Sequence, residues 1–200
     1  MKILSRTFFN RPPQLVAPDL VGKLLLHQSR LGLCGGRIVE TEAYLAAGDS
    51  ACHAAKGKTK RNASMFGPPG HLYVYSIHAK WCLNAVTEPA GCASAVLIRA
   101  IEPLFGVELM QARRPLSTAH DLARGPARLC QALDVTKDQD GVDLTLGESV
   151  WIAREAPAKS AREFEIGIST RIGVTSAHDL QLRFYERGSP FVSGKKALRE

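Results

Sequence analysis

The sequence lacks long hydrophobic runs and the paired cysteine and histidine spacings that hold metal ions. Its apolar stretches are only a few residues long, such as Leu24–Leu26, so we expect no transmembrane helix and no membrane partner. The five cysteines form no C-x-x-C motif, and the six histidines form no H-x-x-x-H or H-E-x-x-H motif. These absences predict free thiols in a reducing compartment, with no metal and no other cofactor.

An apolar leader segment is missing as well. The start, MKILSRTFFNRPP, has no long apolar stretch followed by a small-residue cleavage site, so we expect a cytoplasmic protein. In a bacterium it would lie with the nucleoid if it binds DNA, and in a eukaryote it would be nuclear.

Composition and charge are those of a soluble globular chain with a basic surface. The chain has 200 residues, of which 45% are hydrophobic and 22% charged, which predicts one domain over residues 1–200. Lys and Arg total 26 against 19 Asp and Glu, for a net charge of +7. Phosphate backbones are the commonest partner of such charge, yet many soluble enzymes are equally basic. The net charge alone therefore does not decide whether the protein binds nucleic acid.

Strand patterns dominate the middle of the chain, and helix patterns flank them. They do not alternate as regular βαβ units, so we expect an α+β domain with an antiparallel β-sheet core flanked by helices. A turn is expected at Gly32 and Gly35–Gly36, a structureless polar segment at 46–70, a loop at 160–165 and a frayed tail at 193–200. The predicted helices cover 12–22, 107–114 and 125–133, and the predicted strands cover 23–28, 37–45, 71–77, 81–86, 94–104, 150–153, 165–167 and 182–185.

The strand RIVETEAYL carries two acids and a phenol. Alternation places Glu40, Glu42 and Tyr44 on one face with Ile38, and the remaining apolar side chains on the core face. A solvated strand face is one interpretation. The other is a carboxylate held beside an aromatic wall, where it can act as a general base.

Further polar and aromatic residues leave similar alternatives open. Tyr73 and Tyr75 share a strand face, which is either core or a platform for base stacking. Arg99 lies in an apolar run, so it either pairs with an acid such as Glu102 or contacts substrate. The basic loop at 56–61, Arg128 near a helix start and Asn84 within a strand each allow a structural or a binding role.

Several ordered blocks resemble the alkyladenine (3-methyladenine) DNA glycosylase family of base-excision repair. The resemblance covers about residues 17–193, and VETEAY and GPARLCQAL are its most specific parts. The blocks are RIVETEAYL, DSACH at 49–53, KRN at 60–62, LYVY, LNAV, VLIRAIEPL, GPARLCQAL and RFYERGSPFVS. It implies a monofunctional enzyme that flips an alkylated or deaminated purine out of duplex DNA and hydrolyses its N-glycosidic bond. The implied fold is similar to the C-terminal domain of methionyl-tRNA formyltransferase, and the implied state is a monomer without cofactor.

The resemblance also implies roles for single residues. Glu42 matches the catalytic base that activates water, and Arg99 matches a residue near that water and the DNA backbone. In the base pocket, Tyr44 and Tyr75 match the two stacking walls, His53 matches a hydrogen-bonding partner, and Asn84 matches the amide that excludes guanine. Arg128 lies where the family has a basic residue that contacts DNA, and Lys60 and Arg61 of the basic loop are further candidates for contact with DNA phosphates. The proposal requires that the Glu42 carboxylate border a walled cavity with room for water.

One segment departs from the family pattern. His78 stands where common members have an intercalating tyrosine, and the stretch from Tyr75 to Asn84 is one residue shorter than usual. A smaller, more polar side chain makes a weaker wedge between bases, so weaker retention of a flipped base is expected.

The sequence is also compatible with two other functions. A lesion-binding protein on the same scaffold would have lost catalysis, although Glu42, Tyr44 and His53 are intact. A hydrolase of free nucleosides would have no need of the basic loop and the charge of +7, because its substrate carries no phosphate.

Overall fold

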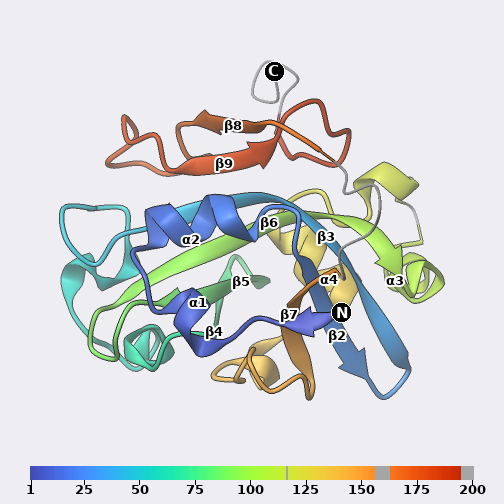
Figure 1. Ribbon diagram of the computed structural model, residues 1–200, viewed down its shortest axis with the longest axis horizontal. Helices are drawn as coiled ribbons and strands as arrows, with labels where there is room; N and C mark the ends of the chain where they lie inside the picture. The colour runs from blue at the N-terminus through green and yellow to red at the C-terminus, as the bar shows by residue number, and fades with distance from the viewer. Residues whose placement is uncertain (116, 156–162, 195–200) are drawn as a thin grey trace.

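The computed structural model describes residues 1–115, 117–155 and 163–194. Within these ranges a nine-stranded antiparallel sheet is flanked by four α-helices (Figure 1). The strands are β1 (Lys2–Ile3), β2 (Leu24–Ser29), β3 (Gly32–Tyr44), β4 (Leu72–Ile77), β5 (Lys80–Thr87), β6 (Ser94–Phe105), β7 (Val150–Arg154), β8 (Ile166–Ser169) and β9 (Arg183–Glu186). The helices are α1 (Arg6–Phe9), α2 (Pro13–Leu20), α3 (Val107–Arg113) and α4 (Pro126–Leu133), with 3₁₀ turns η1 (His53–Lys56), η2 (Ala63–Phe66), η3 (Ala119–Asp121) and η4 (Lys137–Gln139). The predicted α+β class is confirmed.

The long strand β3 organises the sheet. Along the main path the strand order is β1-β7-β2-β3-β6-β5-β4. The first half of β3 pairs with β2, and Glu40–Glu42 in its second half pair with β9, whereas β6 pairs along its other edge. The β8–β9 hairpin therefore forms the upper layer in Figure 1, next to the part of β3 that carries both glutamates.

Helices α2 and α4 cover the main hydrophobic core. Each begins with a proline at its first position, where the missing N–H costs nothing. Helix α2 buries Val16, Ala17 and Leu20 toward β3, and α4 buries Leu129 and Leu133 toward β5 and β6. At eight residues each, these are the longest α-helices in the described ranges, and none there could span a membrane.

The turn predicted at Gly35–Gly36 is wrong. Both residues lie inside β3, and the chain reverses at Arg30–Leu31 instead. A Cβ on Gly35 would overlap the Leu25 carbonyl oxygen, and a Cβ on Gly36 would overlap the Glu102 carbonyl oxygen. These glycines therefore permit a close approach of neighbouring strands. Because glycine is also common in turns, the sequence alone predicted a turn here.

The predicted faces of β3 are only partly right. Irregular pairing with β6 around Ile38–Thr41 shifts the alternation by one residue. As a result Ile38 joins the main core together with Ala43, while Val39 packs with Ala100 and Tyr185 in a separate cluster. Glu40 and Glu42 still share a side, but both are fully buried where β9 pairs with β3.

Two further expectations change. The segment 46–70 is not structureless, because it contains η1 and η2. The tail does not begin to fray at Ser193, which is buried and donates its backbone N–H to Glu40 Oε2 at 2.7 Å. The predicted loop at 160–165 and the tail beyond Gly194 fall largely outside the described residues.

Candidate active site and DNA-binding surface

The aromatic residues predicted for the base pocket converge on one small cavity. Its volume is about 10 Å³, which at most suits a single water molecule. Its walls are Tyr44, His53, Met65, Tyr73, Tyr75 and Asn84. The structure therefore brings together all four residues expected there, although in a closed arrangement.

Hydrogen bonds and ring contacts fix these walls. His53 Nδ1 lies 2.9 Å from the Tyr73 hydroxyl, and its ring meets the Tyr75 ring edge-on at 4.3 Å between centroids. Tyr73 and Tyr75 stack with centroids 5.4 Å apart. The Asn84 amide donates to the Tyr73 carbonyl oxygen at 3.0 Å, so its orientation is set by the backbone of β4.

Packing also sets the protonation of the walls. Burial raises the pKa of Tyr44, Tyr73 and Tyr75, so all three remain phenols at neutral pH. Partial burial of the imidazole, together with the nearby Arg61 charge, lowers the pKa of His53. The walls of this cavity are therefore uncharged at neutral pH.

The Glu42 carboxylate lies at the hydroxyl end of the Tyr44 ring, and among the described residues it is not part of the wall of the small aromatic cavity. Its exposed fraction is 0%. Its Oε1 accepts the Ile172 N–H at 2.7 Å, and its Oε2 accepts the Tyr44 hydroxyl at 3.0 Å and pairs with Arg99 at 3.1 Å. A carboxylate has about four acceptor positions, so these three donors, taken from the described residues, leave one for water. The expected opening onto a cavity is wrong for this closed arrangement.

Arg99 joins Glu42 to a second buried acid, Glu40. The Arg99 Nε lies 3.0 Å from Glu40 Oε1, and Arg183 Nε donates to the same oxygen at 2.7 Å. Although burial alone would raise it, the pKa of Glu40 is held below its usual range by Arg99 and Arg183. Arg99 thus pairs with acids other than Glu102, whose partner is Arg37. These ion pairs link four buried side chains in a row of alternating charge, which runs Arg183, Glu40, Arg99, Glu42.

Outside the small cavity lies a larger one, of about 220 Å³, which Tyr44, His53 and Tyr75 also line. Its other walls include Ile77, residues Ser50–Ala51 and the segment Gly173–Ser176. This outer cavity therefore shares three aromatic walls with the closed one.

The tip of the β4–β5 hairpin carries His78. His78 and Ala79 form a two-residue turn with φ of 47° and 59°, and Ile77 pairs with Lys80. This pairing fixes the register of the shortened segment. The turn leaves His78 exposed at the tip of the hairpin.

The cations predicted to bind DNA lie on two sides of this hairpin. Lys60 and Arg61 are exposed on the pocket side, where the Arg61 guanidinium donates to the Ser76 carbonyl oxygen. Arg128 lies on the opposite side, at a cavity of about 520 Å³ between the hairpin and α4. We call this second site the basic cavity; its charged lining residues are Lys80, Arg113, Arg114, Arg128 and Asp134.

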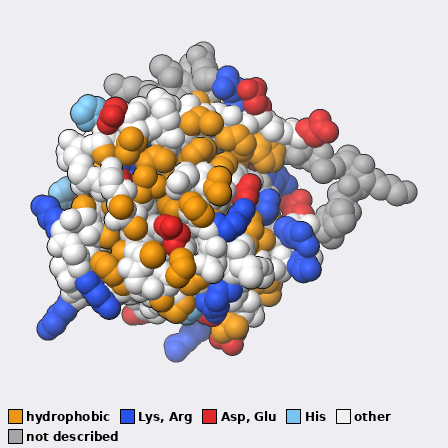
Figure 2. Space-filling view, turned by 60° about the vertical axis from the view of Figure 1, so that its left-hand side comes forward, with side chains coloured by type: hydrophobic (Ala, Val, Ile, Leu, Met, Phe, Trp, Pro, Cys, Tyr) orange, Lys and Arg blue, Asp and Glu red, His pale blue; other side chains and the backbone are white. Residues whose placement is uncertain are grey.

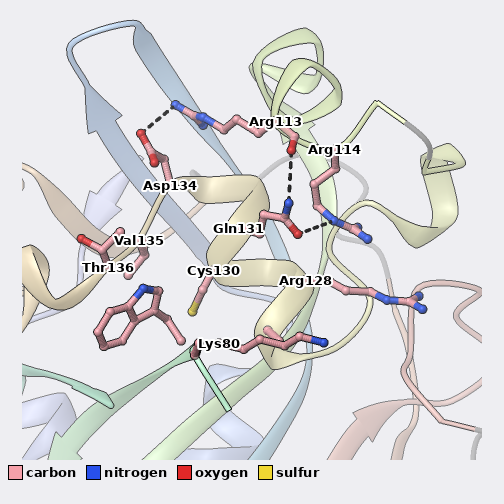
Figure 3. A pocket seen from close by; sticks show the side chains of 12 residues that line it. Lys80, Arg113, Arg114, Arg128, Cys130, Gln131, Asp134, Val135 and Thr136 are labelled. Carbon is pink, nitrogen blue, oxygen red and sulfur yellow. Dashed lines mark hydrogen bonds and ion pairs between the residues drawn. The ribbon is translucent and has the colours of Figure 1, made fainter. Parts of the chain in front are cut away.

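Four cations therefore surround the basic cavity against one acid (Figure 3). Arg113 meets Asp134 at 3.6 Å and the Ala132 carbonyl oxygen at 2.9 Å, and Arg114 meets Gln131 at 3.3 Å. Burial and the neighbouring Arg128 charge lower the pKa of Arg114, as expected where positive charges repel. An anion bound here would relieve that repulsion.

Positive charge is also present elsewhere. The space-filling view shows hydrophobic side chains over the middle of one face and Lys and Arg side chains mainly toward its margins (Figure 2). The charge on this face is therefore spread out, in contrast to its concentration around the basic cavity.

Comparison with known proteins identifies the family. The sequence profile described as "Methylpurine-DNA glycosylase (MPG)" matches residues 7–190. The chain belongs to this family. As a member of the methylpurine-DNA glycosylase family, the protein is a hydrolase that acts on N-glycosyl bonds in DNA repair.

Curated relatives agree over nearly full length. The chain is 48% identical to a protein of Koribacter versatilis over 98% of this chain and 95% of the relative. It is 46% identical to one of Chlorobium phaeobacteroides over 98% of each, and 45% identical to one of Methanocella arvoryzae over 96% of each. All three carry the name "Putative 3-methyladenine DNA glycosylase". The relatives thus include both bacteria and an archaeon.

Several residues of this glycosylase site escaped the sequence analysis. Tyr73 was considered as core or as a stacking platform because it alternates with Tyr75 on one strand face, but it was not among the residues expected to line the base pocket. Asp49 and Arg171 form a buried ion pair across 122 positions, and Arg183 reaches Glu40 across 143 positions. No local pattern marks such long-range pairs, so the sequence alone offered no signal for them.

Proposed function

We propose that this DNA glycosylase flips an alkylated or deaminated purine out of duplex DNA and hydrolyses its N-glycosidic bond with water. The observation that carries the proposal is the convergence of Tyr44, His53, Tyr75 and Asn84 on one cavity, with the Glu42 carboxylate hydrogen-bonded to the Tyr44 hydroxyl. Aromatic walls stack on a flat base, and the imidazole and amide contact its edge.

Glu42 acts as the base in this proposal. Three donors orient its carboxylate, and the remaining acceptor position takes the proton of the attacking water. The same negative charge stabilises the positive charge that develops on the sugar as the bond breaks. Arg99 contacts Glu42 directly and orients the carboxylate toward the reacting water.

Substrate entry has to open the closed pocket. A cavity of about 10 Å³ cannot hold a purine, so Tyr44 or His53 must move as the base enters from the outer cavity. Movement of the Tyr44 ring also frees one acceptor position on Glu42, because its hydroxyl occupies Oε2. Base binding and exposure of the carboxylate to water are thereby coupled.

Different lesions place different demands on this site. A purine methylated at a ring nitrogen, such as 3-methyladenine or 7-methylguanine, already carries positive charge and leaves without further help. A neutral deaminated base needs a proton as it leaves. Flipping costs a few kcal/mol, and least at damaged pairs, which adds selectivity.

The test is release of free base from methylated duplex DNA. We expect Glu42→Gln to lower the single-turnover rate by about 10²–10⁴-fold while lesion binding persists. Glu108→Gln, an exposed acid on α3, serves as the matched control and retains the wild-type rate. Turnover of Glu42→Gln at the wild-type rate would show that the base is another group.

One observation favours a second candidate, a lesion-binding protein without catalysis. The Glu42 carboxylate is enclosed and ion-paired, as a purely structural acid would be. The same assay separates the two functions: a binder retains methylated DNA but releases no base even as the wild-type protein.

A further inference from the structure

The Tyr44 ring has a cation on one of its two faces. The Arg171 guanidinium carbon lies 4.6 Å from the centre of the ring. Since Arg171 covers that face, a base can stack only on the other one. A base bound there and Arg171 would lie on opposite sides of a single ring.

Asp49 cancels this charge. Its two carboxylate oxygens each accept a guanidinium N–H of Arg171 at 2.7 Å, and both side chains are fully buried. Burial alone would raise the pKa of Asp49, but Arg171 and the N–H groups of Leu45 and Ala51 lower it. The pair is therefore ionised on both sides and neutral as a unit.

The pair also ties together the segments that build the pocket. Asp49 binds the backbone at the end of β3 and at the start of the loop that leads to His53. Arg171 donates to the Ala43 carbonyl oxygen at 3.0 Å, and the next residue, Ile172, donates to Glu42. Segment Gly173–Ser176 then lines the outer cavity.

We propose that the Asp49–Arg171 pair is a charge-balanced support for Tyr44 that lets this aromatic wall accept a positively charged purine. The inference rests on the proposed function and deepens it by naming the determinant of substrate class. An aromatic face attracts a cation, but an uncompensated cation behind the same ring opposes it. Arg171 and Asp49 act as positioning residues, because they reach the base only through Tyr44.

The experiment compares two substrates in one protein. Duplex oligonucleotides carry either 7-methylguanine, which is cationic, or hypoxanthine, which is neutral, and single-turnover release rates give a cationic-to-neutral ratio. Asp49→Asn leaves Arg171 uncompensated, so we expect this ratio to fall on the order of tenfold, as like charges across one ring predict at an effective dielectric constant near 20. A purely structural role would lower both rates by the same factor and leave the ratio unchanged, which would overturn the proposal.

Two more variants keep the test decisive if Asp49→Asn folds poorly. Arg171→Gln removes the cation, so its ratio should stay at or above that of the wild type, and a fall would overturn the proposal. The double variant Asp49→Asn/Arg171→Gln removes both charges and should restore the wild-type ratio within about twofold, since no net charge remains behind the ring. A wild-type protein that releases neither base would instead refute the proposed function.

Discussion

The two faces of the β4–β5 hairpin differ in how they are held and in what they are ready to bind. On one face, Tyr73, Tyr75 and Asn84 close around a cavity of about 10 Å³ backed by fully buried ion pairs. On the other, the basic cavity of about 520 Å³ is already open, and its charged groups reach solvent. The basic cavity therefore already has room for a ligand, whereas the aromatic cavity would have to open before it could hold a base.

The hairpin tip stands between these faces. A wedge at His78 that enters a duplex would place DNA across both of them, with the extruded base on the pocket side. The phosphates on the other side would then meet Lys80 and Arg128, where cations exceed acids. Each of the following predictions tests one side of this comparison.

The largest effect is expected from a buried charge on the pocket side. Glu40→Ala leaves Arg99 and Arg183 without their shared carboxylate, so we expect a loss of about 3–5 kcal/mol in the free energy of unfolding. Urea denaturation followed by circular dichroism measures it. Asp121→Ala is the matched control, because Asp121 pairs with Arg128 in partly exposed positions and should cost no more than about 1 kcal/mol. Equal losses of unfolding free energy in Glu40→Ala and Asp121→Ala would show that the buried and the partly exposed ion pairs contribute equally to stability.

The second effect concerns salt. If Lys80 and Arg128 each neutralise a DNA phosphate, the double variant Lys80→Ala/Arg128→Ala lowers the slope of log affinity against log salt by about 2. Fluorescence anisotropy with undamaged duplex at several salt concentrations measures the slope. Arg30→Ala, at the exposed β2–β3 turn, serves as the control and keeps the wild-type slope if it lies away from the DNA. An unchanged slope in the double variant would place the duplex elsewhere.

The third effect concerns the wedge itself. His78→Tyr puts a larger, flatter side chain at the hairpin tip, so we expect several-fold tighter binding to duplex DNA with an abasic site. Competition between abasic and intact duplexes measures this gain. Unchanged or weaker binding to the abasic duplex would show that the tip does not fill the gap left by the flipped nucleotide.

These contrasts also show which features of the fold and the site can be predicted from the sequence. Pro13 and Pro126 mark helix starts and the Tyr73–Tyr75 alternation marks a strand face, because each signal is local to a few residues. The closed pocket and the Arg183–Glu40 pair depend on how distant segments pack, which local patterns do not encode. The same holds for Gly35–Gly36, where close strand contact, not a turn, requires glycine.

The smallest expected effect is a pH dependence of stability that arises on the pocket side. Partial burial of the imidazole and the charge of Arg61 lower the pKa of His53 below its ordinary value of 6.5, so the fold favours the neutral ring. The stabilising contribution is complete above pH 6.5 and is lost as the pH falls through the lowered pKa of the folded state. Between pH 7 and pH 5 the wild type should therefore lose more stability than His53→Gln, by on the order of a few tenths of a kcal/mol, because solvent screens the exposed side of the ring. Urea denaturation at both pH values measures the difference. A steeper loss in His53→Gln would mean that the fold favours the imidazolium, a cation poorly suited to stand beside a positively charged base.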